Sequence, residues 1–204
     1  DANPQSIHRT LARDPLLECR VNNMPGLRLP GSWDPFETAV RAVVGQQISV
    51  KGAVTQLGRI AKLAGDPYDG DGGPLLTRLF PTASELAAAD LATIGMPQKR
   101  KATIRLLSKK IASGELRLDT VGDLSGFVDS LTTIPGIGRW TANYVAMRAL
   151  GEPDAFPASD LGIIKALTQG TTRPTVKQVM ARAEAWRPWR AYAAIYLWHP
   201  QETR

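Results

Sequence analysis

The stretch from Leu131 to Arg148, LTTIPGIGRWTANYVAMR, constrains the fold of this chain more than any other segment. The residue before Pro135 is pushed out of the α region, so a helix that leads into this stretch must end there. Gly136 and Gly138 then allow positive φ and leave no side chain over the turn. Apolar residues recur at helical spacing directly after the turn. The stretch is therefore predicted to form a helix, a tight turn and a second helix.

The predicted turn has the properties of a phosphate-binding site. The first turn of the second helix leaves backbone N–H groups unpaired, and the helix dipole there favours a negative charge. No Cβ atom at Gly136 or Gly138 blocks the approach of a phosphate, and Arg139 adds a cation at the same place. The alternative interpretation is a plain αα-corner whose glycines serve packing only.

The rest of the chain carries helix-start signals and almost no strand signals. Alternating β-branched runs are missing and alanine is abundant, so we expect a nearly all-α fold of about ten helices. Candidate N-cap residues stand before the helical segments, namely Asp34, Ser49, Thr82, Asp90, Asp123 and Thr175. We also predict one helix across residues 1–20, an inward-facing Val54 in the helix after Ser49, and a last helix opened by Pro188.

Composition and charge narrow the classes of function. The formal charge of +6 and the pI of about 9.7 favour a polyanionic partner. Cys19 is the only cysteine, which excludes a disulfide framework or a cysteine-ligated cluster within the chain. His8 and His199 are too far apart in sequence to suggest a metal pair. Neither a membrane-spanning apolar run nor a signal-peptide pattern is present, so we expect no membrane partner and a cytoplasmic protein.

Several motifs together resemble one known superfamily. The pattern L-x-x-x-P-G-[IV]-G-x-x-[TA]-A, here Leu131 to Ala142, resembles the helix–hairpin–helix of the DNA glycosylase superfamily. Within it, the chain is most similar to the AlkA-type 3-methyladenine DNA glycosylase II. The similar segments are PGLRLPG, IGMPQKR, GIGRWTANY and RPWRAYAAIYLW, and they occur in the same order as in that family.

The resemblance implies an arrangement of two helical lobes. One lobe is expected at about residues 36–120, and the other at about 1–35 and 121–204, with the hairpin at 131–148. The antiparallel sheet domain that precedes this region in the family is missing from the sequence. Because the chain begins with Asp1 rather than Met, we expect a processed chain, an excised piece or one module of a fusion protein.

The resemblance also assigns a catalytic residue, Asp160 in FPASDLGII, because the family's catalytic aspartate lies beyond the second helix of the hairpin. Excision of an alkylated purine gives the sugar oxocarbenium character, and a nearby carboxylate stabilises that charge. The same carboxylate can orient or deprotonate the attacking water. The alternative is that Asp160 only caps the helix that follows. Asp154 is the second candidate carboxylate, although its position favours a loop role.

Three aromatic residues are expected to form the base pocket. Trp140 and Tyr144 are four residues apart and share a helix face, and Trp198 stands where AlkA-type enzymes have a base-stacking tryptophan. Electron-rich rings favour a cationic alkylated base. Relatives that cleave the DNA strand have a lysine at the position of Trp140, so the resemblance implies a monofunctional enzyme. The alternative for all three is core packing, an interpretation that we favour for Trp186 and Trp189.

The remaining site residues are expected to contact DNA or an ion. In AlkA-type proteins the loop that here contains Gln46 and Gln47 fills the gap left by the flipped nucleotide. The amides of Gly136 and Gly138, together with Arg139, are expected to bind the phosphate backbone. The resemblance further implies a structural Na⁺ or K⁺ bound by the carbonyls of Thr132, Ile134 and Gly136, and no other cofactor.

Together these features predict a monofunctional DNA glycosylase that flips 3-methyladenine or 7-methylguanine out of duplex DNA and leaves an abasic site. We expect a monomeric, nucleoid-associated protein whose DNA binding is sensitive to salt and independent of sequence. Two alternatives remain open. One is a non-catalytic helix–hairpin–helix module of a larger repair protein, and the other is a glycosylase for an oxidised or deaminated base.

Overall fold

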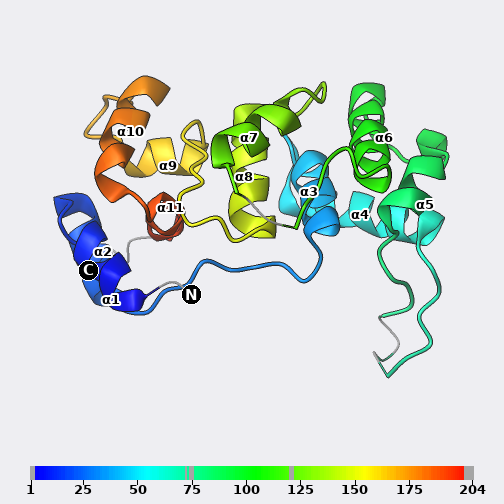
Figure 1. The fold of residues 1–204 in the computed structure, drawn as a ribbon, viewed down its shortest axis with the longest axis horizontal. Coiled ribbons are helices and arrows are strands. Elements are labelled where there is room, and N and C mark those ends of the chain that lie inside the picture. The colour runs from blue at the N-terminus through cyan, green and yellow to red at the C-terminus, as the bar shows by residue number, and fades with distance from the viewer. Residues whose placement is uncertain (1–2, 72, 74–75, 120–121, 200–204) are drawn as a thin grey trace.

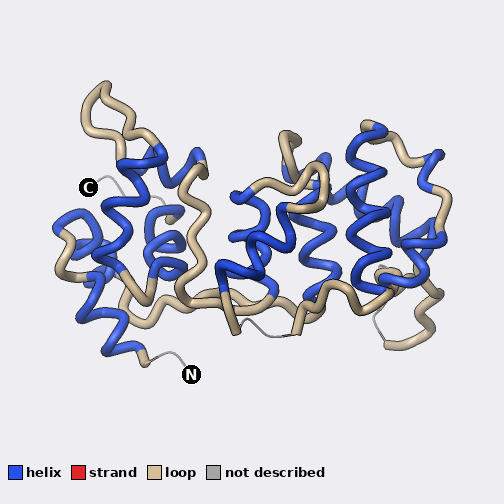
Figure 2. The backbone as a smooth tube through the Cα atoms, turned by 45° about the horizontal axis from the view of Figure 1, so that its top comes forward, coloured by secondary structure: helices blue, strands red, loops and turns tan. Residues whose placement is uncertain are grey.

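The computed structural model describes residues 3–71, 73, 76–119 and 122–199 of the chain. In this part, all regular structure is helical, as predicted, and the only β-type pairs are two isolated bridges (Figures 1 and 2). The helices are α1 (Pro4–Leu11), α2 (Pro15–Asn23), α3 (Pro35–Val44), α4 (Val50–Ala64), α5 (Ala83–Ala88), η1 (Leu91–Thr93), α6 (Gln98–Ala112), α7 (Leu124–Thr132), α8 (Arg139–Ala149), α9 (Leu161–Ala166), α10 (Val176–Ala183), η2 (Glu184–Trp186) and α11 (Arg190–Trp198). None of these helices combines the length and apolar character needed to cross a lipid bilayer.

The predicted N-caps are confirmed because each side chain accepts a hydrogen bond from an orphan N–H of its helix. Asp34 accepts from the Glu37 N–H at 3.0 Å, and Ser49 accepts from the Gly52 N–H at 3.1 Å. Thr82 and Thr175 each form a reciprocal capping box with the residue three positions later. Local sequence therefore fixes where α3, α4, α5 and α10 begin.

Three predictions about helices are wrong. Residues 1–20 form two helices, because Asp14 caps a new helix and Pro15 occupies its first position. The last helix begins at Arg190 rather than at Pro188, after a turn that the hydrogen bond from the Trp189 N–H to the Trp186 carbonyl closes at 2.8 Å. Val54 is 59% exposed, because the buried side of α4 contains Leu57 and Ile60 instead.

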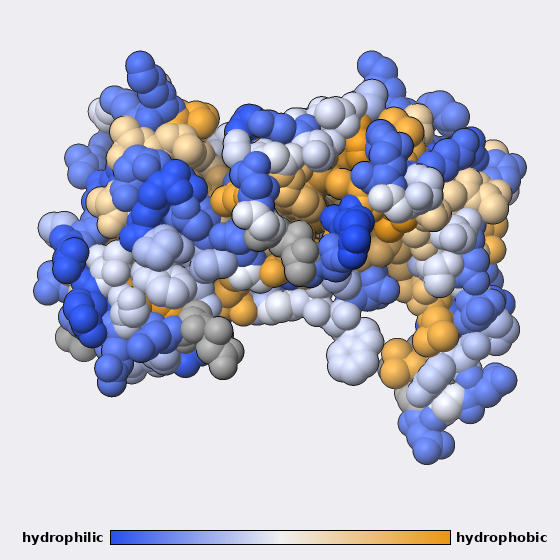
Figure 3. Space-filling model, in the orientation of Figure 1, coloured by the Kyte–Doolittle hydropathy of each residue, from blue (hydrophilic) through white to orange (hydrophobic). Residues whose placement is uncertain are grey.

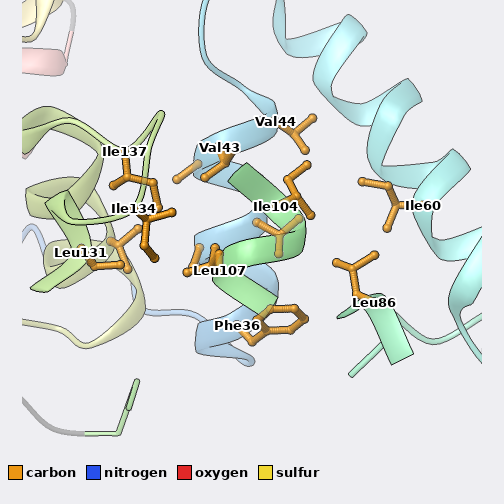
Figure 4. Close-up of a cluster of buried hydrophobic side chains, with 14 of the residues drawn as sticks. Phe36, Val43, Val44, Ile60, Leu86, Ile104, Leu107, Leu131, Ile134 and Ile137 are labelled. Atoms are coloured by element: carbon orange, nitrogen blue, oxygen red, sulfur yellow. The ribbon is translucent and has the colours of Figure 1, made fainter. Parts of the chain in front are cut away.

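Two clusters of buried side chains form the core, and α8 contributes to both. The first cluster joins α3, α4, α5, α6 and the hairpin helices. In Figure 4, Leu131, Ile134 and Ile137 of the hairpin point toward the side chains of α3 and α6. The second cluster joins α1, α2 and α9 to α11. Along α8, Ala142 and Val145 belong to the first cluster and Ala146 and Met147 to the second.

The two ends of the described chain lie side by side. Helices α1 and α2 contact α11 and η2, and a long connection over residues 24–34 then leads to α3 in the middle of the molecule (Figure 1). The Asp14 carboxylate accepts hydrogen bonds from Arg182 at 2.7 and 3.0 Å and from the Trp186 indole at 2.8 Å. In Figure 3, hydrophobic residues gather over the middle and right of the face shown, whereas the end that carries α1 and α2 is mostly hydrophilic.

Candidate active site

The hairpin turn has the tight backbone that the sequence predicted. Gly136 has φ of +93°, and a Cβ atom built there would lie 2.3 Å from the Thr103 hydroxyl oxygen. That hydroxyl donates to the Pro135 carbonyl at 2.7 Å, so α6, which carries Thr103, is hydrogen-bonded to the turn. Gly138 is the N-cap of α8 and provides no side-chain cap, and a Cβ built there meets nothing within 4 Å. The first amides of α8 therefore have no side-chain cap.

Arg139 follows directly and lies at the surface. Its guanidinium donates to Asp129 at 2.9 Å, with 69% and 60% of the two side chains exposed. A pair this exposed contributes little to stability. A phosphate can therefore compete with Asp129 for Arg139 at small cost.

The Gln46–Gln47 loop packs against the hairpin. The Gln46 amide donates to the Gly136 carbonyl at 3.0 Å and to the Thr141 hydroxyl at 2.9 Å. Arg100 in turn donates to the Gln46 carbonyl at 2.6 Å. Gln47 is exposed, with φ of +56° in the left-handed region. The side chain of Gln46 thus joins loop to hairpin, while Gln47 forms the tip.

Asp160 caps α9, as one of the two interpretations predicted, and its carboxylate also has two indole donors. Oδ1 accepts from the Gly162 and Ile163 N–H groups at 2.8 and 3.1 Å and from Trp198 Nε1 at 2.7 Å. Oδ2 accepts from Trp140 Nε1 at 3.0 Å. Four N–H donors complement a charged acceptor, and Oδ2 keeps a lone pair for a further partner.

The three predicted aromatic residues meet at this carboxylate. The Trp140 and Tyr144 rings stack with centroids 5.3 Å apart and an interplanar angle of 18°, and Tyr144 lies 6.3 Å from Trp198 at 48°. All three side chains are half-buried, whereas Trp186 is fully buried in the second cluster, as predicted for core packing. The guanidinium carbon of Arg148 lies 5.9 Å from the Tyr144 centroid.

Space around Asp160 is limited at Gly162. A Cβ atom on Gly162 would lie 3.0 Å from Asp160 Oδ1 and 3.0 Å from Trp198 Cδ1. Such contacts are tighter than ordinary van der Waals distances, so a larger residue would push the indole away from the carboxylate. The missing side chain at Gly162 is what lets Trp198 reach Asp160.

Trp140 separates two pockets of about 440 Å³ each. One pocket lies between α3 and α8 and is lined by Trp140, Tyr144 and Arg148, with Trp33 at its rim. The other lies toward α7 and α10 and contains Asp154. The first is large enough for a purine, and Asp160, which lines neither pocket, accepts a hydrogen bond from Trp140 of its wall.

Asp154, the second candidate carboxylate, is committed to an ion-pair network. It accepts from Arg190 at 2.8 and 3.0 Å and also pairs with Arg187, which bonds Glu184 as well. A side-chain hydrogen bond from Arg187 lowers the pKa of Glu184. Arg190 is 7% exposed, so this network fixes the start of α11. Asp154 therefore positions α11, the helix that carries Trp198.

The carbonyls predicted to hold a cation are partly engaged within the hairpin. The Ile134 carbonyl accepts from the Ile137 N–H at 3.0 Å, and the Gly136 carbonyl accepts from Gln46. A carbonyl oxygen has two lone pairs, so each keeps one. Oxygen ligands of this kind suit Na⁺ or K⁺. The described side chains contain no cluster of histidine, cysteine, aspartate or glutamate arranged for a metal ion.

Sequence reasoning missed the residues that act through long-range contacts. Thr103 and Arg100 stand in a segment that looks like a solvated basic helix, and Asn143 bridges the Arg139 carbonyl and the Phe156 N–H at 2.9 and 3.1 Å. The segment IGMPQKR, which resembles the family, covers the start of α6 but does not indicate these contacts.

Comparisons with known proteins identify the family of this chain. The DNA-3-methyladenine glycosylase 2 of Escherichia coli is 40% identical over 202 residues, which cover 98% of this chain and 67% of that protein. The chain belongs to the AlkA-type 3-methyladenine DNA glycosylases. A family model described as the AlkA N-terminal domain matches residues 1–34, and the described part of this segment contains α1, α2 and the connection to α3.

Two further relatives of this AlkA-type chain extend the comparison. The probable bifunctional transcriptional activator/DNA repair enzyme AlkA of Mycobacterium tuberculosis is 40% identical over 97% of the chain, which spans only 40% of that protein's length. The structure of the Schizosaccharomyces pombe 3-methyladenine DNA glycosylase Mag1 in complex with abasic DNA has a TM-score of 0.73 and 25% identity, covering 95% of each chain. The chain therefore has the helix–hairpin–helix glycosylase fold.

Proposed function

We propose that this chain is a monofunctional DNA glycosylase that hydrolyses the N-glycosidic bond of alkylated purines in duplex DNA and leaves an abasic site. The observation that carries the proposal is the Asp160 carboxylate, which two indole N–H groups hold at 2.7 and 3.0 Å beside the Trp140–Tyr144 stack. Phosphate binding alone requires neither the carboxylate nor the rings.

The arrangement suits the chemistry of alkylpurine release. Alkylation makes the base a cationic leaving group, so the bond breaks with positive charge developing on the sugar. Asp160 would stabilise that charge through Oδ2, or orient the water that attacks C1′. The aromatic wall of Trp140 and Tyr144 would attract the electron-poor base by stacking and cation–π interaction. The base must leave the DNA stack first, because its glycosidic bond is otherwise hidden.

The DNA contacts would come from the hairpin and from the Gln47 loop. Open amides at the start of α8 suit a phosphate, and the DNA complex of Mag1 supports such a partner for this fold. Gln47 at the loop tip would fill the gap left by the flipped nucleotide. A Na⁺ or K⁺ held by the carbonyls of Thr132, Ile134 and Gly136 would add positive charge next to this phosphate. We further propose that the protein is a cytoplasmic monomer when it binds DNA.

Trp140 supports hydrolysis without strand cleavage. Cleavage by a lyase requires an amine that forms a Schiff base with the sugar. At the position of that amine this chain has Trp140, whose indole N–H donates to the Asp160 carboxylate. We therefore expect no covalent enzyme–DNA adduct when borohydride is added during turnover, whereas a trapped adduct would contradict the monofunctional assignment.

The test of the function is base release from duplex DNA treated with a methylating agent. We expect free 3-methyladenine and 7-methylguanine, abasic sites in equal amount, and no release from untreated DNA. DNA binding without release by the folded protein would instead support the non-catalytic module. Release only from DNA with oxidised or deaminated bases would support the third interpretation.

A further inference from the structure

Arg20 of α2 is a buried cation in an unusual position. Arg20 is only 8% exposed, and no carboxylate in the described part of the chain forms an ion pair with its guanidinium. Burial lowers the pKa of Arg20. Its Nε atom has no hydrogen-bond partner among the described residues. A charge buried at such cost needs a compensating contact.

That contact is with the end of α11, across 176 and 179 positions of sequence. Arg20 Nη1 donates to the carbonyls of Tyr196 and His199, both at 2.8 Å. These carbonyls lie on either side of Trp198 in the chain. Carbonyls at a helix C-terminus lack intrahelical donors, and a cation there also complements the helix dipole. Arg20 therefore closes the last turn of α11 around Trp198.

The position of this turn controls a short hydrogen bond at the candidate site. Trp198 Nε1 donates to Asp160 Oδ1 at 2.7 Å, and its Cδ1 is in close contact with the Cβ position of Gly162. The indole therefore has little freedom to compensate for a shift of its backbone. A second tie from the same segment, the Tyr196 hydroxyl to the Met24 carbonyl at 3.1 Å, holds the helix laterally.

We infer that Arg20 is a positioning residue for the glycosylase reaction, which acts by fixing the last turn of α11 so that the Trp198 indole holds the Asp160 carboxylate. This inference rests on the proposed function. It gives the N-terminal helices α1 and α2, whose buried side chains belong to the second cluster, a role at the reaction centre.

The test compares Arg20→Met, which keeps the aliphatic stem, with Arg20→Lys, which keeps a donor. Arg13→Met is the matched control, because Arg13 is exposed on the same segment. Single-turnover release of 3-methyladenine is expected to fall about tenfold or more in Arg20→Met, since small misplacements of catalytic groups have large effects. Arg20→Lys should recover most of the rate, and binding to duplex DNA with a tetrahydrofuran abasic analogue should stay unchanged.

A double-mutant cycle separates positioning from a general structural role. In a Trp198→Phe background the indole N–H is already lost, so Arg20→Met should reduce the rate less than about twofold further. An equal reduction in both backgrounds would overturn the inference. So would an unchanged rate in Arg20→Met with a lower melting temperature.

One measurement does not depend on activity. The indole ¹⁵N–¹H resonance of Trp198, assigned by its loss in Trp198→Phe, should shift in Arg20→Met and not in Arg13→Met. If the native protein released no base, the proposed function would fail while this resonance still tested the contact. An unshifted resonance in Arg20→Met would contradict the inference even if base release were normal.

Discussion

At the scale of single residues, the candidate site depends on which atoms each side chain leaves available. Asp160 accepts three hydrogen bonds at Oδ1 and one at Oδ2, so its geometry is fixed and Oδ2 keeps one lone pair. Asp154, six residues earlier, has its carboxylate covered by two guanidinium groups. The two aspartates therefore differ in the chemistry open to them, because different side chains surround their carboxylates.

Asp14 provides a prediction about stability and pH. Burial by itself would raise the pKa of Asp14, but hydrogen bonds from Arg182, the Leu16 N–H and Trp186 together lower it. The unfolded chain then binds the proton more tightly, so the stabilisation is present above about pH 4 and is lost as the pH falls through the folded-state pKa. Asp14→Asn keeps the cap and should cost about 2 kcal/mol of unfolding free energy at pH 7.

Urea unfolding at pH 7 and pH 3 measures this effect. The difference between the native protein and Asp14→Asn should shrink at pH 3, because the carboxylate of the unfolded chain, with a pKa of about 3.9, is then largely protonated. Asp129→Asn is the control, because its ion pair with Arg139 is exposed and should contribute little at either pH. An undiminished difference at pH 3 would show that the charge of Asp14 is not the cause.

At the scale of elements, the hairpin turn contains two glycines with different structural roles. Gly136 needs positive φ and has no room for a Cβ atom, because a Cβ built there would lie 2.3 Å from the Thr103 hydroxyl oxygen. Gly138 has φ of −91° and open space around it. The first glycine is required by the fold, and the second only by what approaches the turn from outside.

Alanine at each glycine separates these roles. Gly136→Ala should lower the melting temperature by several degrees, because the turn must shift against α6. Gly138→Ala should leave the melting temperature unchanged and weaken binding to abasic-analogue duplex, because its methyl group would stand in the path of a phosphate. Equal DNA affinity for Gly138→Ala and the native protein would contradict the phosphate-binding role of this turn.

The elements also show what could be predicted from sequence. Helix starts followed from Asp34, Ser49 and Thr82, because a cap needs only residues within three positions. The Trp140–Tyr144 stack followed from spacing along one helix. The new helix at Pro15 and the start of α11 at Arg190 were missed. At Pro15 the cap signal of Asp14 was outweighed by apolar spacing, whereas α11 begins without a side-chain cap and Pro188 was taken as its start.

The contacts that complete the site could not be predicted from local pattern. Trp198 reaches Asp160 across 38 positions, Gln46 reaches Gly136 across 90, and Arg20 reaches Tyr196 across 176. No periodicity or cap encodes such pairs, because they form only when segments far apart in the sequence pack against one another. The family resemblance supplied Trp198 and Asp160 as separate expectations. Their direct hydrogen bond is visible only in the structure.

At the scale of the whole molecule, the site lies where the two clusters meet along α8. The buried hairpin residues Leu131, Ile134 and Ile137 belong to the first cluster (Figure 4), whereas Trp198 packs against the second. The chain carries a formal charge of +6 for a polyanionic partner. The proposed phosphate contacts and the proposed chemistry require a fixed relation between the two clusters, and α8 contributes buried side chains to both.

Binding to DNA should therefore depend on salt. The logarithm of the binding constant for abasic-analogue duplex should fall linearly with the logarithm of salt concentration, because cations released from DNA add entropy to binding. Arg139→Ala should reduce the magnitude of that slope by about one. Arg9→Ala, on α1 at the far end of the molecule, should leave the slope unchanged (Figure 1). An identical slope for Arg139→Ala and the native protein would contradict a phosphate contact at Arg139.

The central claim is that the Asp160 carboxylate performs the chemistry, and single-turnover base release by Asp160→Asn tests it most directly. Asparagine caps a helix about as well as aspartate, so the variant should fold, and Asp90→Asn is the matched control because Asp90 caps η1 in the same way. We predict that release of 3-methyladenine falls by about a hundredfold or more in Asp160→Asn, with abasic-analogue binding retained and Asp90→Asn fully active. Native-like release by Asp160→Asn would contradict the catalytic assignment.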